Sequence, residues 1–334
     1  MHGMTDLKNL LVVGGAGYIG SHMVKVLLQH GHQVTILDNL STGYADAVMG
    51  GEFLKGDLAD RDILKEVMSR RRFNAVMHFA SYIEVGESVL NPGKYYRNNV
   101  ANTLNLLDAM VEARVCCFIF SSSAAVYGNP QRAPLDEDHP TSPVNPYGRT
   151  KLLVEQILED YDHAHGLKSV SLRYFNAAGA DPSGKLGERH EPESHLIPRV
   201  LQSASGRRNG VTVFGTDYDT PDGTCIRDYI HVVDLCEAHL AGLDHLSSTQ
   251  RSLRVNLGNG NGYSVREVID ASRRVTQREF PVSYGERRAG DAPRLVAECA
   301  LARKLLGWNP RYPELDTIIE HAWRWELNMV KRGM

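Results

Sequence analysis

The sequence predicts an α/β fold, with a doubly wound parallel sheet followed by a second, smaller domain. Short apolar runs alternate with segments of helical length through roughly the first half of the chain, as expected of a sheet covered by helices on both faces. A glycine-rich turn at residues 14–20 joins the first apolar run to the first helix. The 334 residues exceed the usual size of one hydrophobic core, so two domains are expected, and 42% hydrophobic residues can bury both.

The first half of the chain contains the alternating elements. Residues 10–13 are uniformly apolar, which predicts a strand buried on both faces. A helix from near Ser21 to Gly31 and a strand at 34–38 complete the first β-α-β unit. The alternation continues with strands at 52–55, 75–79, 117–120 and 169–172 and helices at 63–70, 95–113 and 147–164. This order predicts parallel strands, because each connection passes through a helix.

Beyond residue 176 the alternation becomes irregular. Residues 180–192, the segment richest in proline, glycine and charge, predict a long exposed loop. Helices are predicted at 196–205, 265–275 and 315–330, strands near 211–213 and 255–257, and a strand leading into a helix at 229–246. We therefore expect a first domain at 1–175, to which part of 228–250 returns, and a second domain at 176–334.

Composition excludes several classes of function. A formal net charge of -3 offers no global attraction for nucleic acid or anionic lipid. The 5 cysteines form no Cys-x-x-Cys motif, which fits a reducing compartment. Residues 1–6 lack the features of a signal peptide, and no apolar run approaches the ~20 residues needed to span a bilayer. We expect a soluble cytoplasmic protein with no nucleic-acid or membrane partner.

Metal binding is not expected from the histidines. The 14 histidines are dispersed along the chain, and none belongs to a His-Glu-x-x-His motif. His163 and His165 stand too close in sequence to share a helical face. The sequence therefore predicts no metal site.

The glycine turn and the carboxylates after it predict a dinucleotide site. Gly14, Gly17 and Gly20 depart from Gly-x-Gly-x-x-Gly in their first spacing, but they still allow a tight turn and amides facing a pyrophosphate at a helix N-terminus. Asp38 ends the second strand, where it can accept the adenosine ribose hydroxyls and would repel a 2′-phosphate, so NAD is favoured over NADP. Asp57 could bind the adenine amino group. As alternatives, Asp38 is a turn former and Asp57 a loop carboxylate.

Tyr147 and Lys151 form a candidate catalytic pair. Four residues are slightly more than one helical turn, so the phenol and the ammonium share one helix face. A phenol ionises near pH ~10, and a neighbouring cation favours the phenolate, which makes a better base. The spacing alone also fits a half-buried ring beside a solvated lysine stem. The glycine turn upstream favours the catalytic interpretation.

Nearly the whole chain resembles the extended short-chain dehydrogenase/reductases and, within them, the UDP-galactose 4-epimerases. The matching blocks lie at residues 14–20, 78–80, 85–88, 121–123, 126–128, 147–151, 173–176 and 227–232. The resemblance implies a Rossmann domain with NAD, a smaller substrate-binding domain and reversible C4 epimerisation of a UDP-hexose through a 4-keto intermediate. It also implies a homodimer packed through 95–113 and 147–164.

The resemblance assigns roles to individual residues. Tyr147 would be the base, Lys151 would bind the nicotinamide ribose and lower the pKa of the phenol, and Ser123 would hydrogen-bond the reacting oxygen. The implied cofactor-binding residues are Gly14, Gly17, Tyr18, Ile19, Gly20, Asp38, Asn39, Asp57, Leu58, Phe79, Ala80, Asn98, Ser121, Tyr147, Lys151 and Tyr174. The implied substrate-binding residues are Ser123, Tyr147, Phe175, Asn176, His195, Leu196, Phe214, Arg227, Arg288, Asp291 and Leu295.

Arginines and an aromatic residue in the substrate set have structural alternatives. Arg227 and Arg288 would bind the pyrophosphate, because a guanidinium fits anionic oxygens. Arg227 could instead form an ion pair with a neighbouring carboxylate such as Asp228. Phe214 could be an ordinary core residue.

The chain departs from the family pattern at three positions. Ile83 stands where many members have a lysine near the cofactor ribose, and His195 stands where others have asparagine beside the sugar nucleotide. Leu295 stands where some members have a bulky tyrosine. The smaller side chain predicts space for an N-acetyl group, and hence turnover of UDP-N-acetylglucosamine.

Two other functions fit parts of the pattern. A nucleotide-sugar dehydratase or decarboxylase would share the fold and the Tyr-Lys pair, but dehydratases carry an acid next to the catalytic Ser/Thr, where this chain has Ala124 and Ala125. A non-catalytic dinucleotide sensor would need neither Tyr147 nor Lys151. Both alternatives are less favoured than epimerisation.

Overall fold

The computed structural model describes residues 7–288 and 291–333. The N-terminal segment 1–6, where the sequence predicted no signal peptide, lies outside the described residues, as do 289, 290 and 334. The described residues divide into two compact units, the first from Met1–Val126, Pro143–Arg173 and Cys236–Val255, and the second from Tyr127–Ser142, Tyr174–Leu235 and Asn256–Met334. The domain boundaries drawn from the sequence, and the functions assigned to the domains, stay predictions.

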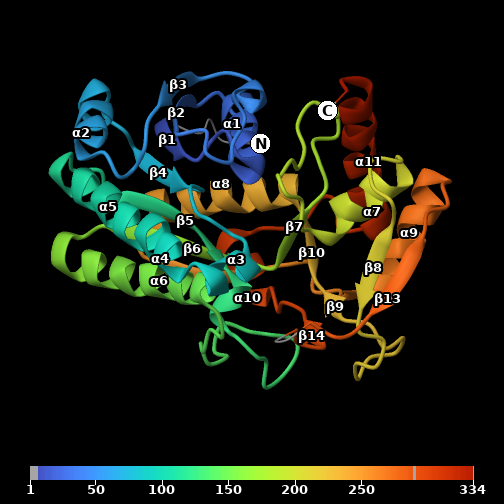
Figure 1. Cartoon of the computed structure of the whole chain (residues 1–334). Coiled ribbons are helices and arrows are strands. Elements are labelled where there is room, and N and C mark those ends of the chain that lie inside the picture. The colour runs from blue at the N-terminus through green and yellow to red at the C-terminus, as the bar shows by residue number, and fades with distance from the viewer. Residues whose placement is uncertain (1–6, 289–290, 334) are drawn as a thin grey trace. The chain divides into compact units, whose positions relative to one another are not determined.

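A seven-stranded sheet forms the centre of the first unit, in the order β11-β6-β5-β4-β1-β2-β3 (Figure 1). Its strands are β1 (Asn9–Val13), β2 (Gln33–Asp38), β3 (Glu52–Lys55), β4 (Ala75–His78), β5 (Cys117–Ser123), β6 (Lys168–Tyr174) and β11 (Leu253–Leu257). The pairs β1–β2, β1–β4, β2–β3 and β4–β5 are parallel. The predicted doubly wound sheet is confirmed, and the strand order reverses at β1, which has β2 on one side and β4 on the other.

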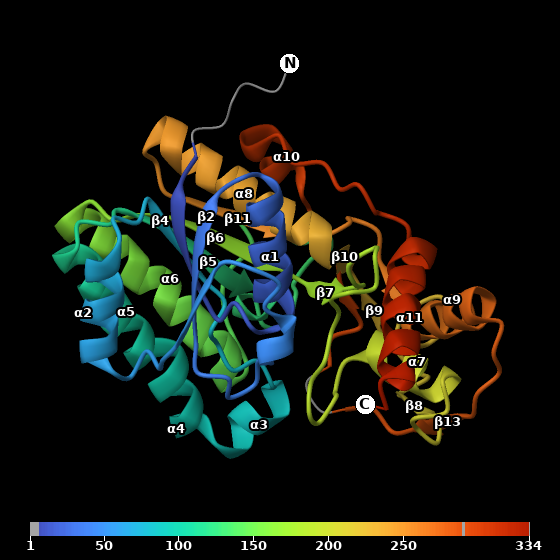
Figure 2. The same ribbon diagram turned by 90° about the horizontal axis from the view of Figure 1, so that it is seen from above.

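Helices cover both faces of this sheet. They are α1 (Tyr18–Gln29), α2 (Arg61–Arg70), α3 (Val85–Leu90), α4 (Pro92–Tyr95), α5 (Asn102–Glu112), α6 (Pro146–His165) and α8 (Val232–Thr249), with short turns η1 (Ala45–Ala47) and η3 (Ala124–Val126). Figure 2 shows α2, α5 and α6 on one side of the sheet and α1 on the other. Leu64, Leu106 and Val154 of the first three helices join Val76 and Phe118 of the strands in one buried cluster, whose burial drives the docking.

The predicted helix at 95–113 is continuous but not uniform. Its first turn, α4, passes into a π-helical segment, η2 (Tyr96–Ala101), before α5 begins. Segments of this kind inside α-helices often lie at functional sites. The first predicted helix begins earlier than expected, at Tyr18, because Gly17 is already its N-cap.

Small sheets and a three-helix core form the second unit. Its strands are β7 (Asn176–Ala178), β8 (Val211–Phe214), β9 (Ile226–Arg227), β10 (Tyr229–His231), β12 (Tyr263–Ser264), β13 (Val282–Gly285) and β14 (Arg294–Leu295). They form the sheets β10-β7, β12-β9-β14 and β13-β8. The helices are α7 (Leu196–Ala204), α9 (Val265–Thr276), α10 (Ala300–Leu306) and α11 (Leu315–Lys331). Ile197, Val268 and Ile318 of α7, α9 and α11 share one buried cluster.

The segment 180–192 is irregular, as predicted, but the prediction that it is exposed is wrong. Leu186 is 2% exposed and Asp181 is 4% exposed. Gly187 lies so close to Trp325 of α11 that a β-carbon on it would overlap the indole, and the indole nitrogen of Trp325 donates to the carbonyl of Glu188 (3.0 Å). The charge and glycine content therefore reflects close packing and ion pairing. Among the helices described, none is long and apolar enough to cross a membrane.

Candidate active site

The predicted cofactor residues of the first unit gather where its parallel strands end. Gly14 follows β1, Asp38 ends β2, Phe79 follows β4, and Ser121 lies near the end of β5. Because carboxyl ends of parallel strands meet at the same edge of a sheet, these residues line one edge, beside the reversal of strand order at β1. Ligands of doubly wound sheets bind at this place.

The glycine turn leaves room for a ligand at the start of α1. Gly14 has φ +80°, and a β-carbon on it would lie 2.6 Å from the backbone nitrogen of Ala80. A β-carbon on Gly20 would overlap the carbonyl oxygen of Gly14, whereas on Gly17 it would lie at an ordinary 3.4 Å from that oxygen. No side-chain hydrogen bond caps α1. The first-turn amides, those of Tyr18 and Ile19 included, can therefore face an anion such as a pyrophosphate.

Two carboxylates extend this edge beyond the glycine turn. Asp38 is 8% exposed, and its oxygens accept hydrogen bonds from the amides of Ala16 (2.9 Å) and Leu40 (2.8 Å). Each oxygen keeps a second lone pair, which a ribose hydroxyl can use. Asn39 donates to Asp57 Oδ2 (2.7 Å), which joins the ends of β2 and β3. This arrangement fits a dinucleotide without a 2′-phosphate.

The start of α6 carries Tyr147 because three local features place a helix end there. Asn145 is the N-cap and accepts from the amide of Gly148 (2.8 Å), and Pro146 occupies the first helical position. A β-carbon on Gly148 would lie 2.5 Å from the carbonyl oxygen of Ala125. The first turn of α6 therefore packs closely on the segment after β5, the strand that ends at Ser123.

Ser123, Tyr147 and Lys151 come together as predicted from the sequence. Ser123 hydrogen-bonds the Tyr147 phenol; burial raises the pKa of that phenol, and this bond opposes the rise. Lys151 Nζ lies 5.8 Å from the centre of the Tyr147 ring and donates to the Ser81 hydroxyl (3.0 Å) and the Ser121 carbonyl (2.7 Å). Burial lowers the pKa of Lys151 to about 7, with Glu155 opposing. Control of the phenol pKa by Lys151 stays a prediction.

Asn99 is a structural residue that the sequence analysis missed. It lies in η2, is 1% exposed, and accepts from the amide of Tyr82 (2.9 Å) while donating to the carbonyl of Tyr82 (3.0 Å) and to Thr150 Oγ1 (3.1 Å). Its neighbour Asn98, predicted to contact the cofactor, donates to Asn99 Oδ1 (2.9 Å). The π-helical segment thus connects the loop after β4 to α6, next to Lys151. Nothing in the sequence except the asparagine itself indicated this role.

Glu155 was missed as well. It is 1% exposed, one helical turn beyond Lys151. Arg173 Nε donates to Glu155 Oε1 (2.9 Å), and Ser122 Oγ donates to the same oxygen (2.6 Å). The spacing of four residues from Lys151 was the available signal. This buried ion pair fixes the helix face that carries Lys151.

Several predicted substrate residues of the second unit also lie together. Arg227 pairs with Asp291 (3.2 Å) and donates to the carbonyl of Ala292 (2.8 Å), and Leu295 faces Arg227 across the β14–β9 pair. Arg227 therefore does form an ion pair, as the structural alternative held, but its partner is Asp291 and not Asp228, whose carboxylate accepts backbone amides. These amides belong to Asn259 (2.6 Å), Gly260 (3.0 Å) and Ala297 (3.0 Å).

The other substrate candidates occupy distinct positions in the second unit. Phe214 is half-buried, and the guanidinium of Arg288 lies 4.1 Å from the centre of its ring, which is a cation–π contact. Asn176 Nδ2 donates to the carbonyl of Asp228 (3.0 Å). Leu196 packs against the helix core. Tyr174 and Phe175, at and after the end of β6, are half-buried, and Ile83 in the first unit is 38% exposed.

His195 belongs to a cluster that the sequence analysis did not recognise. It precedes α7, and its Nδ1 lies 2.9 Å from Glu188 and 3.0 Å from Glu193. Burial lowers the pKa of His195, but the two carboxylates outweigh burial and raise it well above its ordinary value. In the same way they raise the pKa of His190 to about 9.

Comparisons with known proteins show which family this chain is similar to. Residues 10–258 match the model of the NAD dependent epimerase/dehydratase family. The chain is 53% identical over 326 residues to the UDP-glucose 4-epimerase of Rhizobium meliloti, covering 98% of this chain and 99% of the relative. It superposes on the Brucella ovis UDP-glucose 4-epimerase in complex with NAD with a TM-score of 0.93 and 52% identity, covering 95% and 97% of the two chains. The UDP-Glc/GlcNAc 4-epimerase of Campylobacter jejuni matches with a TM-score of 0.85 and 44% identity, covering 96% and 99%.

Proposed function

The chain belongs to the NAD dependent epimerase/dehydratase family, and we propose that it catalyses the reversible C4 epimerisation of a UDP-hexose. The observation that carries this proposal is the buried grouping of Ser123, Tyr147 and Lys151 at the sheet edge that also holds the glycine turn. UDP-glucose 4-epimerases are among its relatives at about half identical residues over nearly the whole chain. In the proposed epimerisation, Tyr147 would be the base, and the cofactor would lie beside it.

The cofactor is NAD. The amides at the start of α1 would hold its pyrophosphate, and Asp38 would accept its adenosine ribose hydroxyls. When bound, NAD would accept a hydride from C4 and later return it, so that each cycle is redox-neutral. Lys151 would bind the nicotinamide ribose from its position between Ser81 and Ser121.

Tyr147 would take the proton from the sugar 4-hydroxyl as C4 is oxidised, and return it after the 4-keto sugar has presented its other face. Ser123, which hydrogen-bonds the phenol, would also hydrogen-bond the reacting oxygen. Both side chains are nearly excluded from solvent, at 8% exposed each. Exclusion of water strengthens these hydrogen bonds and protects the keto intermediate.

The nucleotide would be held by the second unit. Arg227 and Arg288 are the cations that would bind the pyrophosphate. Asn176, Leu196, Phe214 and Asp291 would line the rest of the site, together with Phe175 and His195. Because the sugar must turn between the two half-reactions, most of the binding energy should come from UDP and little from the sugar.

We also propose that the N-acetylated pair is a substrate. Leu295 is half-buried beside Arg227, and it lacks the bulk of a tyrosine. A relative of this chain is described as a UDP-Glc/GlcNAc 4-epimerase. Replacing Leu295 by tyrosine should reduce turnover of UDP-N-acetylglucosamine more than that of UDP-glucose, and equal losses on both would contradict the assignment.

We also propose that the protein is a homodimer and that it acts in the cytoplasm. The helical stretch from α4 to α5, together with α6, would form the interface. Light scattering coupled to size exclusion measures the assembly, and a monomer mass would refute the dimer.

Incubation of the purified protein with UDP-galactose, UDP-N-acetylgalactosamine or UDP-xylose, without added NAD, tests the reaction directly. We expect interconversion of the 4-epimers with no release of reduced cofactor. Chromatography of the nucleotide sugars detects the products. Accumulation of a keto or deoxygenated sugar would instead indicate a dehydratase, which Ala124 and Ala125 after Ser123 do not favour. An inactive protein that still binds NAD would indicate a sensor.

A further inference from the structure

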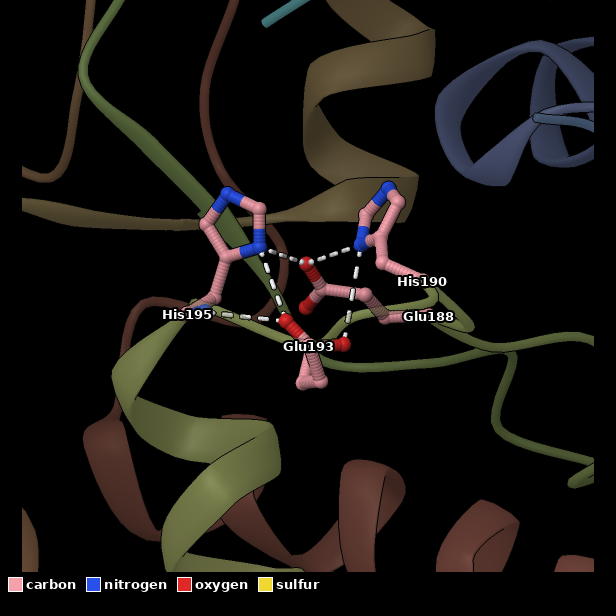
Figure 3. A group of neighbouring side chains, drawn as sticks. All are labelled: Glu188, His190, Glu193 and His195. Carbon is pink, nitrogen blue, oxygen red and sulfur yellow. Dashed lines mark hydrogen bonds and ion pairs between the residues drawn. The ribbon is translucent and has the colours of Figure 1, made fainter. Parts of the chain in front are cut away.

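Two carboxylates and two imidazoles converge in the segment that leads into α7. Glu188, His190, Glu193 and His195 lie within eight residues of sequence, and Figure 3 shows their side chains pointing toward one another. One donor atom from each lies within 4.8 Å of the other three. We call these four residues the Glu-His quartet.

Four contacts within the Glu-His quartet are close to the spacing of ligands around a tetrahedral metal ion, and they involve both oxygens of Glu193. His195 Nδ1 lies 2.9 Å from Glu188 Oε1 and 3.0 Å from Glu193 Oε1, and His190 Nδ1 lies 3.3 Å from Glu188 Oε1 and 3.6 Å from Glu193 Oε2. Four ligands at about 2.0–2.1 Å from a central zinc are separated by about 3.3 Å. The observed spacings bracket that value, and both histidines present the same nitrogen to the centre.

Burial and charge require a cation at this place. The side chains of Glu188 and Glu193 are only 6% and 4% exposed. Two buried carboxylates are costly unless positive charge compensates them. Either two imidazolium protons or one divalent cation bound by neutral imidazoles brings the Glu-His quartet to neutrality. The side chains of the Glu-His quartet suit a divalent metal ion, because imidazole and carboxylate are both ligands of zinc.

The backbone holds one of the carboxylates in place. Glu193 Oε1 accepts from the amides of Ser194 (2.9 Å) and His195 (2.9 Å), and His195 is the N-cap residue of α7. Hydrogen bonds of this kind orient ligands and tune metal sites. The Trp325 indole, which donates to the Glu188 carbonyl (3.0 Å), anchors the other end of the segment to α11.

We propose that the Glu-His quartet is a structural site for a divalent transition metal ion, with Zn²⁺ the preferred ion. Four protein ligands close the coordination sphere, which is the property of structural zinc sites, whereas catalytic sites keep a position for water. The ion would fix the segment 188–195 at the start of α7, and with it Leu196. The site shares no residue with the Ser123, Tyr147 and Lys151 group and takes no part in the proposed hydride chemistry.

Metal titration of the full-length protein tests the proposal. After removal of metal by a chelator, the protein should bind one equivalent of Zn²⁺ per chain, and Co²⁺ in its place should give the intense visible absorption of a tetrahedral site without thiolate charge-transfer bands. Thiolate bands would indicate binding at the cysteines, of which Cys116 is exposed, and would overturn the assignment.

Substitutions within the same loop supply matched variants. His190→Gln and Glu188→Gln each remove one ligand and should lower Zn²⁺ affinity by more than the roughly 10–100-fold that loss of an outer partner costs. Glu191→Gln removes an exposed carboxylate next to His190 and should leave affinity unchanged. Equal affinity in wild type, His190→Gln and Glu191→Gln would overturn the proposal.

A measurement on the wild-type protein needs no variant. Zn²⁺ should raise the melting temperature of the chelator-treated protein, and the rise should grow with free Zn²⁺ concentration, because a ligand of the native state stabilises it by mass action. A melting temperature that does not change with Zn²⁺ would mean that protons alone neutralise the Glu-His quartet.

Discussion

Lys151 in the first unit and the two histidines of the Glu-His quartet in the second are basic side chains held within the protein, but their partners differ. Lys151 donates to a hydroxyl and a carbonyl, which carry no net charge, and burial lowers its pKa to about 7. The histidines of the Glu-His quartet face carboxylates, and the pKa of His190 rises to about 9. The difference teaches that burial beside neutral acceptors leaves a cation poised near neutral pH, whereas neighbouring carboxylates favour the charged form of a basic side chain in the absence of a metal ion.

The same contrast appears among the carboxylates. Glu155 in the first unit pairs with Arg173, while Asp228 in the second unit accepts three backbone amides, and burial raises the pKa of Asp228 to about 6 despite them. Removing a charge from a charged partner should therefore cost more than removing one from neutral partners.

Tyr147→Phe should produce the largest effect, because it removes the only proposed base. We expect turnover to fall by about 10²–10⁴-fold, the usual contribution of a positioned acid or base, while bound NAD and melting temperature stay at wild-type values. The coupled rate of UDP-galactose conversion measures it. Tyr161→Phe is the matched control, since this tyrosine lies on the same helix and hydrogen-bonds Asp108 instead (2.5 Å). Wild-type turnover in Tyr147→Phe would remove the phenol from the mechanism.

Glu155→Gln should be the most destabilising of the substitutions considered, because it leaves Arg173 buried without its counter-charge. Breaking a buried pair in this way costs about 3–5 kcal/mol, measurable by denaturant unfolding of the NAD-bound protein. Glu159→Gln, one turn further along α6, breaks an exposed pair with Arg254 (2.9 Å) and should cost at most about 1 kcal/mol. Similar losses in the two variants would show that burial does not set the energy of the Glu155 pair.

The sequence predicted the parts of the first unit that depend on local pattern. The glycine turn, the strand ends and the grouping of Ser123 with Tyr147 follow from apolar runs, glycine positions and helical spacing, all within short stretches of chain. The environment of Lys151 could not be predicted, because its neutral partners, Ser81 in the loop after β4 and Ser121 in β5, lie far from it in the sequence.

The second unit was harder to predict for two physical reasons. Strands β9, β12 and β14 have two residues each, too few to show an alternation of apolar and polar positions. Part of the segment 180–192 packs at Gly187 against Trp325, which lies more than 130 residues further along the chain. The Glu-His quartet lies in an irregular loop. A search for histidines at helical spacing therefore could not find it.

Asp228→Asn should have an intermediate effect and a distinctive pH dependence. The amide replaces one of the acceptor oxygens by a donor, and loss of the acceptor for one or two of the three backbone amides should cost about 1–3 kcal/mol. Because the pKa of Asp228 is raised to about 6, the native state binds more protons than the unfolded state between pH ~4 and ~6. Wild type therefore gains stability from this group at low pH and loses it as the pH rises through about 6.

Unfolding free energies of wild type and Asp228→Asn at pH 4.5 and pH 7 check this sign. The destabilisation caused by the substitution should be larger at pH 4.5. Asp270→Asn, at an exposed position on α9, should show no such difference. A destabilisation that grows toward pH 7 would mean that Asp228 is a favourable charge in the native protein, contrary to its raised pKa.

Loss of a helix cap should have the smallest effect on stability. The same loss should affect turnover in the first unit and not in the second. Asn145→Ala on α6 and Ser264→Ala on α9 each remove an N-cap that accepts a backbone amide, at 2.8 Å and 3.0 Å, and each should cost about 0.5–2 kcal/mol. Only α6 carries Tyr147 in its first turn, so only Asn145→Ala should also lower turnover, because small displacements of a catalytic group reduce rate. Turnover and unfolding measured on both variants decide the point: equal turnover would mean that packing of Gly148 against Ala125, rather than the cap, holds the phenol in place.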